Sequence, residues 1–496
     1  MNRPSVPGQA GNDMRKPNKE DLQTVAVEHE QGHLFLFWDQ LSARQRRMLL
    51  EDIDRIDFPA VTELITGEAS RIPESRWTGP VEPVECLPDP WDAAVAEDYR
   101  TARRHGESLI AQGKVAAMTV AGGQGTRLGF DGPKGLFPIS PVRNKSLIRL
   151  LAEGIAGTQR RYRCEIPWYI MTSPANDGAT RDYFKENRCF GLSPQNVFFF
   201  QQGVMPVLSR DGKILLDQKH RVALAPDGHG GSLTALASSG ALEDMARRGA
   251  EVVSYFQVDN PLVRPVDPLL VGLHDIHQAE ASTITIRKAN DLERVGNFVR
   301  IGDRLHVIEY TELSPELAHD RTQSGQRRFD AANLSIFLFS RVFLDSLTSG
   351  RSDISLPWHR ADKKTPYVDL AGGERVEPSE PNAMKFELFV FDALPLARRT
   401  VILRSRREEC FTPVKNATGV DSVITARRDM SHRAAKWLGA CGVNVPIRGD
   451  AEPLHACEIS PLVAQDEREL AEVLKDMPPP TCDGSCYVGE PRAGRI

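Results

Sequence analysis

Hydrophobic residues follow a helical rhythm in the first part of the chain. From Leu22 to about Ile65 they recur at the spacing of one helix face. Residues 1 to about 20 are polar and contain three prolines, which is typical of a disordered arm. We therefore expect residues 1–110 to form a helical N-terminal domain that begins with this arm.

After about residue 114, short apolar runs alternate with amphipathic stretches of helical length. The runs predict strands at Val115–Val120, Trp168–Thr172, Val197–Phe200, Val252–Val258 and Thr283–Ile286. The stretches predict helices at Ser146–Tyr162, Arg181–Phe190, Leu233–Arg248 and Pro268–Ala279. This alternation is typical of an α/β fold with a mostly parallel sheet, whose ligands bind beyond the carboxyl ends of the strands.

The pattern also places the end of this central body. Further strands are expected at Leu305–Tyr310 and Ser335–Phe339, and the strongly apolar run Phe386–Leu396 predicts a closing helix. The central domain is thus expected at residues 111–396. Residues 397–496, which begin with a strand-like run, are expected to form a small C-terminal domain.

Composition excludes two classes of partner. The chain has 62 lysines and arginines against 67 acidic residues, so a net charge of -5 provides no field for nucleic acid or an anionic membrane. No segment has the length and apolar character of a signal peptide or a membrane span. We expect a soluble, cytoplasmic protein without nucleic-acid or membrane partners, and the sequence indicates no particular protein partner.

The cysteines agree with a reducing compartment. Eight cysteines scattered over 496 residues do not form a dense disulfide framework. Only Cys482 and Cys486 lie close together, and they lack a second ligand pair at zinc-site spacing. The sequence favours neither a metal site nor a redox pair there.

A glycine-rich segment follows the first expected strand. It reads AGGQGTRLG from Ala121 to Gly129 and continues as FDGPKG to Gly135. Glycines let the backbone approach an anion closely, and Arg127 and Lys134 add positive charge. Neither a P-loop nor a dinucleotide fingerprint fits the spacing. The segment predicts a polyphosphate cradle, and the alternative is a tight glycine turn with incidental basic residues.

This segment resembles the nucleotide-binding loop of the nucleotide-sugar pyrophosphorylases. It is most similar to that of the eukaryotic-type UDP-N-acetylglucosamine pyrophosphorylases, within the UTP:sugar-1-phosphate uridylyltransferase family. Further segments resemble this family in the same order: Met171–Ser173, Gln201–Pro206, Ala225–Gly231, Val258–Asn260, Tyr367–Asp369, Asn382–Glu387, Pro413–Asn416 and Cys457–Pro461.

The resemblance implies a fold and a reaction. The fold would have a Rossmann-like sheet of the nucleotide-diphospho-sugar transferase type. In the reaction, a sugar 1-phosphate attacks the α-phosphorus of UTP, and pyrophosphate leaves with Mg²⁺ bound, without a covalent enzyme intermediate. The implied substrates are UTP and a sugar 1-phosphate, the products are a UDP-sugar and pyrophosphate, and the cofactor is Mg²⁺.

The resemblance also assigns the residues around the nucleotide. Arg127, Lys134, Lys385 and Lys415 are expected to bind phosphate groups, and Asp259 is expected to bind Mg²⁺ at the carboxyl end of a strand. The expected nucleotide-binding residues are Gly122, Gly123, Gly125, Thr126, Gln201 and Gly228, with the Gln201 amide reading uracil. The alternative for Asp259 is a helix N-cap or turn residue, whereas Gln201 and the later lysines, taken alone, would be solvated surface residues.

His229, Glu309 and Asn333 are the expected sugar-binding residues. Carboxylates and amides can hold pairs of hydroxyls, whereas the alternatives are an exposed Glu, a turn Asn and a packed His. The acetylamino-sugar enzymes usually have Gly-Asn-Gly-Gly and the glucose enzymes Gly-His-Gly-Asp where this chain has Gly228-His229-Gly230-Gly231. The loop therefore combines features of both branches.

We expect N-acetylglucosamine 1-phosphate as the acceptor, because more of the chain resembles that branch. An alternative with the same chemistry is a UTP:glucose (or galactose) 1-phosphate uridylyltransferase. An alternative of another class is a nucleotide-sugar binding protein without catalysis. The presence of Arg127, Lys134, Asp259 and Lys415 favours an enzyme.

Overall fold

A computed structural model of the chain describes residues 18–67, 79–348, 356–449, 452–477, 480–482 and 484–490. They divide into two compact units. The first draws its residues from Met1–Glu74, Val204–Asp227 and Pro357–Glu387, and the second from Ser75–Gly203, Gly228–Leu356 and Leu388–Ile496. This division differs from the expected parts 1–110, 111–396 and 397–496. Two insertions from the middle of the chain complete the first unit, and the C-terminal part belongs to the second.

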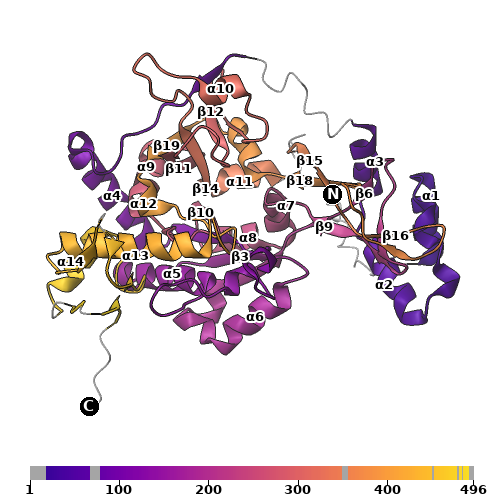
Figure 1. Ribbon diagram of the computed structural model, residues 1–496, viewed down its shortest axis with the longest axis horizontal. Coiled ribbons are helices and arrows are strands. Elements are labelled where there is room, and N and C mark those ends of the chain that lie inside the picture. The colour runs from indigo at the N-terminus through magenta and orange to yellow at the C-terminus, as the bar shows by residue number, and fades with distance from the viewer. Residues whose placement is uncertain are drawn as a thin grey trace, which may run out of the picture. The chain divides into compact units, whose positions relative to one another are not determined.

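The first unit combines short helices with small sheets (Figure 1). Its helices are α1 (Lys19–Glu28), α2 (Ala43–Ile53) and α3 (Phe58–Thr66), with 3₁₀ helices at Gly32–Phe35 and Trp38–Gln40. Helix α2 begins with a capping box between Ser42 and Gln45, and α3 ends at Gly67 with a positive φ. The helical character expected for the stretch from Leu22 to Ile65 is confirmed.

The strands of the first unit come mostly from its two insertions. The largest sheet has the order β15 (Trp358–Lys363), β18 (Ala383–Leu388) and β6 (Leu208–Ser209). Two-stranded pairs are β5 (Val204–Pro206) with β9 (Leu224–Pro226), β7 (Leu216–Gln218) with β8 (Arg221–Val222), and β16 (Tyr367–Val368) with β17 (Arg375–Val376). Buried side chains such as Leu49 and Phe386 share one core between these helices and strands.

The second unit is built on a large sheet. Within the described residues its order is β1-β12-β14-β10-β2-β3-β4, with β11 beside β14, β19 beside β11 and β13 beside β12. The strands are β1 (Val81–Pro83), β2 (Val115–Val120), β3 (Trp168–Thr172), β4 (Val197–Gln201), β10 (Val252–Gln257), β11 (Ala281–Arg287), β12 (Asn297–Ile301), β13 (Arg304–Ile308), β14 (Ala331–Ser340) and β19 (Thr400–Arg404). Strands β10, β2, β3 and β4 are parallel, whereas β14 runs antiparallel to β10 and β11.

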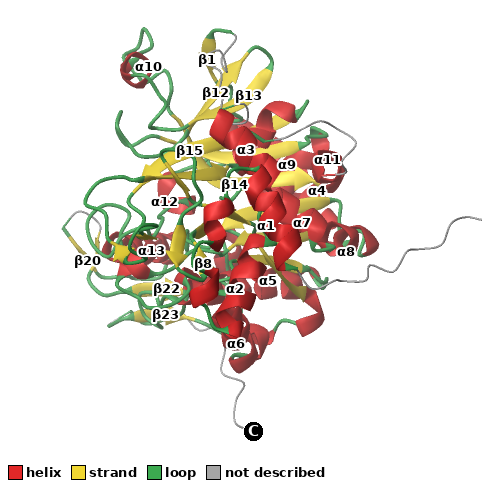
Figure 2. Ribbon diagram, turned by 90° about the vertical axis from the view of Figure 1, so that its right-hand side faces the viewer, coloured by secondary structure: helices red, strands yellow, loops and turns green. Residues whose placement is uncertain are grey.

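Helices cover both faces of this sheet (Figures 1 and 2). Side chains alternate between the faces, so Ala117 packs with one set of helices and Ala116 and Met118 with the other. The first set is α4 (Ala96–Ala111), α5 (Leu147–Tyr162), α9 (Pro268–Ile276) and α13 (Val423–Ala440). The second is α7 (Gly231–Ser238), α8 (Ala241–Arg247) and α11 (Arg341–Thr348). The expected α/β class is confirmed.

The remaining elements of the second unit are short. They are helices α6 (Asp177–Glu186), α10 (Pro315–His319), α12 (Arg407–Cys410) and α14 (Glu467–Leu474), and the strand pairs β20 (Ile447–Arg448) with β21 (Glu452–Pro453) and β22 (Cys457–Ile459) with β23 (Cys486–Val488). No helix in the described part of the chain has the length and apolar character needed to cross a membrane.

Two expected elements are corrected by the structure. The helix expected at Phe386–Leu396 is wrong, because its first residues belong to strand β18 and Val390–Leu396 is a 3₁₀ helix with a proline inside. An apolar run of this length cannot by itself distinguish a buried strand from a helix. The helix expected at Leu233–Arg248 is two helices, because Gly240 adopts a φ of 77° between them.

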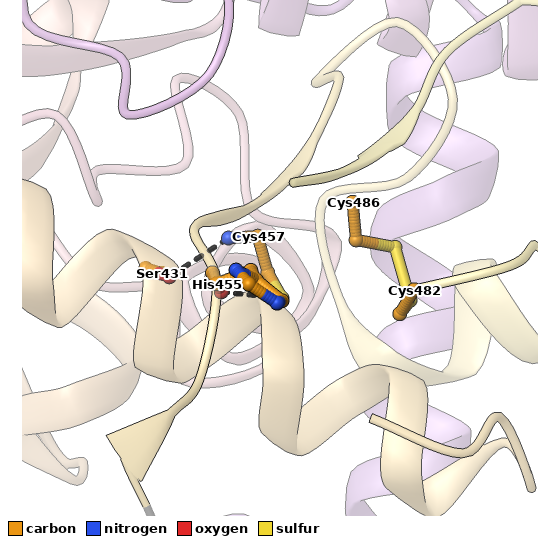
Figure 3. The surroundings of a disulfide bond; sticks show 5 residues. All are labelled: Ser431, His455, Cys457, Cys482 and Cys486. Carbon is orange, nitrogen blue, oxygen red and sulfur yellow. Dashed lines mark hydrogen bonds between the residues drawn. A yellow bond between two sulfur atoms is a disulfide. The ribbon is translucent and has the colours of Figure 1, made fainter. Parts of the chain in front are cut away.

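The close cysteines also differ from the expectation. Cys482 and Cys486 form a disulfide with their Cα atoms 4.9 Å apart (Figure 3). Cys486 lies in β23 opposite Cys457 of β22, whose N–H donates a hydrogen bond to Ser431 Oγ at 2.8 Å. The disulfide closes a short loop next to the strand pair that ends the described chain.

Candidate active site

A cleft with a volume of about 730 Å³ opens in the second unit. Residues from six expected positions line it, namely Arg127, His229, Asp259, Glu309, Asn333 and Lys415. Arg127, Asp259 and Glu309 follow β2, β10 and β13, and Asn333 lies in β14. His229 and Lys415 come from two further segments that are far apart in the chain. Because β2 and β10 are parallel, with Gln257 beside Val120, their carboxyl ends meet at this cleft.

The glycine-rich segment folds back on itself after β2. Gly125 N–H donates to Gly132 O at 2.8 Å, and Lys134 N–H donates to Gly123 O at 3.0 Å. The side chain of Asn176 donates to Ala121 O at 2.9 Å and fixes the start of the loop from outside. The backbone of the loop is thus held before any ligand binds.

The exposed part of this loop carries Gly123, Thr126 and Arg127, whereas Gly122 and Gly125, two further expected nucleotide-binding residues, are buried. Thr126 and Arg127 form a 3₁₀ turn that ends at Gly129 with a φ of 70°. Arg127 is exposed and has no hydrogen-bond or ion-pair partner among the described residues. Gly123 is exposed beneath the stem of Lys134, and a Cβ there would lie 4.0 Å from it.

Lys134 and Asp259 form an ion pair beside this loop. The distance from Lys134 Nζ to Asp259 Oδ2 is 2.9 Å, and each side chain is 17% exposed. Burial alone would raise the pKa of the Asp259 carboxyl, but the ammonium groups of Lys134 and Lys415 outweigh it, so the pKa lies below its ordinary value. Asp259 is therefore a carboxylate at neutral pH.

The donor set around Asp259 fits a metal that is held largely by its substrate. Within the described ranges, no three His, Cys, Asp or Glu side chains converge into an all-protein metal site. Mg²⁺ is commonly bound by one or two carboxylates together with phosphate oxygens and water. A single charged carboxylate beside Lys134 and Lys415 is compatible with that mode of binding.

Lys415 reaches the cleft from the C-terminal part of the chain. Its Nζ lies 3.2 Å from Asp421 Oδ2, and its side chain is about one-third exposed. The preceding residue anchors the segment, because Val414 N–H donates to Asp259 O at 2.9 Å. This backbone bond brings Lys415 next to the end of β10.

His229 is packed and hydrogen-bonded. Its ring stacks on Phe389 with a centroid distance of 5.2 Å, and its Nδ1 accepts a hydrogen bond from Val390 N–H at 3.1 Å. Tyr255 Oη donates to His229 O at 3.1 Å. Because Nδ1 accepts, the neutral ring carries its proton on Nε2. His229 thus serves the local packing and also lines the cleft.

Glu309 and Asn333 meet around Gly296. A Cβ on Gly296 would lie 2.8 Å from Glu309 Oε1 and 3.6 Å from Asn333 Cβ, so only glycine fits there. Strand β14 bulges after Asn333, with Ser335 at a φ of 54°, and Ser335 N–H donates to Asn333 Oδ1 at 2.9 Å. The bulge and this bond fix the direction of the Asn333 amide.

The structure separates the two adjacent glutamines. Gln201 is exposed at the end of β4 and hydrogen-bonds to the Asp177 carboxylate. Gln202 is 7% exposed, and a Cβ on Gly122 would lie 2.7 Å from its Oε1. The amide next to the glycine loop is therefore that of Gln202. Side chains alternate along a strand, so only one of two neighbouring residues can face that loop. The sequence alone does not determine which of the two it is.

Two expected residues lie elsewhere in the fold. Gly228 has a φ of 87° at the start of its segment of the second unit, a conformation that favours glycine. Lys385 lies half-buried in β18 of the first unit and is not among the residues that line the cleft. Its contact with phosphate stays a prediction.

The cleft also contains residues that no motif indicated. Gln257 ends β10, Phe391 and Phe411 come from later segments, and Arg294 precedes β12. Arg294 lies in a stretch without recognisable spacing, so its position depends on the tertiary fold. The only sequence signal near it is the following Val295-Gly296.

A family model described as UTP--glucose-1-phosphate uridylyltransferase matches residues 89–435. The chain is 36% identical to human UDP-N-acetylhexosamine pyrophosphorylase-like protein 1 over 92% of this chain and 95% of that protein. It is 35% identical to UDP-N-acetylglucosamine diphosphorylase 2 of Arabidopsis thaliana over 90% of each.

The fold has a counterpart among solved structures. The uridine diphosphate N-acetylglucosamine pyrophosphorylase from Trypanosoma brucei, solved in complex with an inhibitor, has a TM-score of 0.81 and 24% identity, covering 97% of this chain and 99% of that chain. This likeness confirms the expected nucleotide-sugar transferase type of fold.

The matched range contains every residue that lines the cleft. Proteins of this kind generally use a divalent metal. The resemblance seen in the glycine loop and the later segments is confirmed, and the chain belongs to the UTP--glucose-1-phosphate uridylyltransferase family of nucleotidyltransferases.

Proposed function

We propose that this protein transfers the uridylyl group of UTP to N-acetylglucosamine 1-phosphate, with Mg²⁺ as the metal, and forms UDP-N-acetylglucosamine and pyrophosphate. The composition of the cleft carries the proposal. Arg127, Lys415 and the Lys134–Asp259 pair bring cations for phosphate groups, and Glu309 and Asn333 bring groups that hold hydroxyls. A reaction that joins a nucleotide to a sugar phosphate needs both.

The phosphate side rests on the glycine loop and the ion pair. The exposed backbone at Gly123 and Thr126, with the buried Gly125 between them, approaches the triphosphate, and Arg127 neutralises its charge. In the free chain Lys134 and Asp259 neutralise each other. With substrate bound, Lys134 would donate to phosphate oxygens and Asp259 would hold Mg²⁺, which would supply further positive charge to the reacting phosphates.

No side chain has to act as a nucleophile, because the attacking oxygen belongs to the sugar phosphate. Catalysis then depends on holding that oxygen in line with the leaving pyrophosphate and on stabilising the charge that develops. The ammonium of Lys415 acts on the Asp259 carboxyl, which supports a role for Lys415 in stabilising the developing charge. Lys385 is proposed as a further phosphate ligand.

Gln202 is proposed as the residue that reads uracil, in place of Gln201. Its amide packs on Gly122 at the start of the loop, and an amide donates and accepts hydrogen bonds together, as a pyrimidine edge requires. The positive φ of Gly228 lets its backbone pass close to the base.

Two observations bear on the identity of the sugar, and they favour different sugars. The curated relatives named above act, by name, on N-acetylhexosamine or N-acetylglucosamine nucleotides, which supports an acetylamino sugar. His229 stands where the acetylamino-sugar enzymes usually have asparagine, which favours glucose 1-phosphate as a second candidate. The cytoplasmic location expected from the sequence stays a prediction.

Pyrophosphate release tests these assignments. Purified protein is incubated with UTP, Mg²⁺ and a panel of N-acetylglucosamine, glucose and galactose 1-phosphates. We expect the highest kcat/KM with N-acetylglucosamine 1-phosphate. Preference for glucose 1-phosphate would select the second candidate, and binding of UDP-sugar without release of pyrophosphate from any pair would identify a non-catalytic binding protein.

A further inference from the structure

Several charged side chains of the cleft are paired. Asp259 pairs with Lys134, Asp421 pairs with Lys415, and Glu293 accepts a hydrogen bond from Arg407 Nη2 at 2.6 Å. Two guanidinium groups that line the cleft, those of Arg127 and Arg294, are exposed and have no ion-pair or hydrogen-bond partner among the described residues. Arg127 belongs to the glycine loop, whereas Arg294 has no role so far.

The loop that carries Arg294 is fixed by its own contacts. Asp291 accepts hydrogen bonds from Arg321 Nη2 at 2.6 Å and Arg327 Nε at 2.5 Å. Glu293 also accepts from Ala289 N–H at 2.6 Å. Arg294 therefore follows a carboxylate that is bonded on two sides, and its backbone is held before substrate binds.

The residues after Arg294 place it near the expected sugar-binding groups. Val295 is buried, and Gly296 O accepts a hydrogen bond from Asn333 N–H at 2.8 Å. Gly296 also lies against the Glu309 carboxylate. Arg294 thus lies in the segment that packs on Glu309 and Asn333, while Arg127 lies in the glycine loop after β2.

We propose that Arg294 is a substrate-binding residue for the hexose 1-phosphate, with its guanidinium donating hydrogen bonds to the phosphate oxygens of that substrate. The inference rests on the proposed function. Two phosphate-bearing substrates must share one cleft, so the second phosphate needs a cation of its own. A guanidinium can bind a phosphate through two parallel N–H donors, and the unpaired one of Arg294 lines the same cleft as Glu309 and Asn333 and meets this need.

Steady-state kinetics with separate variation of the two substrates tests this role. The variants are Arg294→Ala and Arg294→Lys, with Arg300→Ala as the control, since Arg300 lies in β12 outside the cleft lining and, among the described residues, its side chain bonds only to Asp303 O. We expect Arg294→Ala to raise KM for the sugar 1-phosphate by on the order of tenfold or more and to leave KM for UTP within about twofold. Arg294→Lys should recover part of the loss, and Arg300→Ala should behave as wild type.

Equilibrium binding separates this inference from the proposed function. Titration of UTP with Mg²⁺ by calorimetry should give the same Kd in wild type and Arg294→Ala. A raised KM or Kd for UTP would assign Arg294 to the triphosphate and overturn the inference, as would an unchanged KM for the sugar 1-phosphate. If wild type itself releases no pyrophosphate with any sugar 1-phosphate, the proposed function fails first.

Discussion

Lys134 Nζ donates a hydrogen bond to Asp259 Oδ2 at 2.9 Å, at the point where the glycine loop meets the end of β10. Two residues with different expected partners, phosphate and metal, therefore contact each other in the free chain. Both side chains are largely buried, and the Lys134 ammonium helps to keep the Asp259 carboxyl ionised. In the proposed roles, binding of triphosphate with its cation would exchange this ion pair for two new ones without leaving a buried charge unpaired.

Asp259→Asn tests the metal role within this pair. The amide keeps the shape and can still accept from Lys134, but it loses the charge that holds a hard cation. We expect activity to fall by on the order of a hundredfold and half-saturation to need roughly tenfold more Mg²⁺. Asp303→Asn, at an exposed turn, is the control. An Asn variant that titrates with Mg²⁺ like wild type would mean that another acid binds the metal.

Arg127→Ala and Lys134→Ala should resemble each other in activity and differ in stability. Each removes a cation aimed at the phosphates, so turnover should fall by on the order of a hundredfold. Arg127 has no partner in the described structure, so its loss should change the free energy of unfolding by less than about 0.5 kcal/mol. Lys134→Ala leaves the Asp259 carboxylate without its ammonium and should cost about 1–3 kcal/mol.

Pyrophosphate release and urea unfolding measure the two effects. Near-normal turnover in both variants would remove the glycine loop from triphosphate binding. Equal losses of stability in both would show that Arg127 also has a structural role.

The adjacent glutamines provide a matched pair. Gln202→Ala removes the amide that packs on Gly122, whereas Gln201→Ala removes one that bonds to Asp177 at the surface. We expect KM for UTP to rise about tenfold in the first variant, the effect of roughly 1.4 kcal/mol, and to stay within about twofold in the second. The opposite order in initial-rate measurements would restore Gln201 as the uracil reader.

A buried histidine gives a pH prediction outside the cleft. His274 of α9 contacts Ser282 Oγ through Nδ1 at 2.7 Å, and burial lowers its pKa from 6.5 to about 4. Below about pH 6.5 the His274 imidazole binds a proton in the unfolded chain but stays neutral in the folded chain. The free energy of unfolding therefore falls as the pH drops toward 4. Between pH 7 and pH 5 this loss amounts to about 2 kcal/mol.

Urea unfolding at pH 7 and at pH 5 measures this loss of stability. In His274→Asn the difference between pH 7 and pH 5 should shrink by about that amount, because no imidazole titrates. His277→Asn, at an exposed position one turn further on, should keep the wild-type difference. Equal pH dependence in all three proteins would show that His274 does not resist protonation.

Local patterns predicted the central strands and the loop well. Val115–Val120 and Trp168–Thr172 have the predicted bounds because each is a mostly apolar run in a strand that is buried except at Val120. The glycine loop was visible because its chemistry lies within fifteen consecutive residues, from Ala121 to Gly135. Both depend on neighbours in the chain.

Features that depend on tertiary contacts could not be predicted in the same way. The assignment of residues 357–387 to the first unit follows from strand pairing between β18 and β6, which apolar periodicity does not encode. Arg294 reaches the cleft only because its loop is bonded to Arg321, Arg327 and Arg407. The choice between Gln201 and Gln202 depends on which amide meets Gly122.

The last prediction concerns the sugar and the role of His229. Its Nδ1 accepts from Val390 N–H, and an asparagine Oδ1 can accept the same bond while its amide N–H₂ becomes available to an acetylamino group. His229→Asn should therefore keep the fold and raise the ratio of N-acetylglucosamine to glucose 1-phosphate usage in kcat/KM by roughly tenfold, the effect of one well-placed hydrogen bond. His229→Ala, which loses the bond to Val390 and the stacking on Phe389, should lose stability without gaining selectivity. Both ratios are measured at the same UTP and Mg²⁺ concentrations. An unchanged ratio in the Asn variant would mean that His229 only packs the loop and that selection among sugars rests on Glu309 and Asn333.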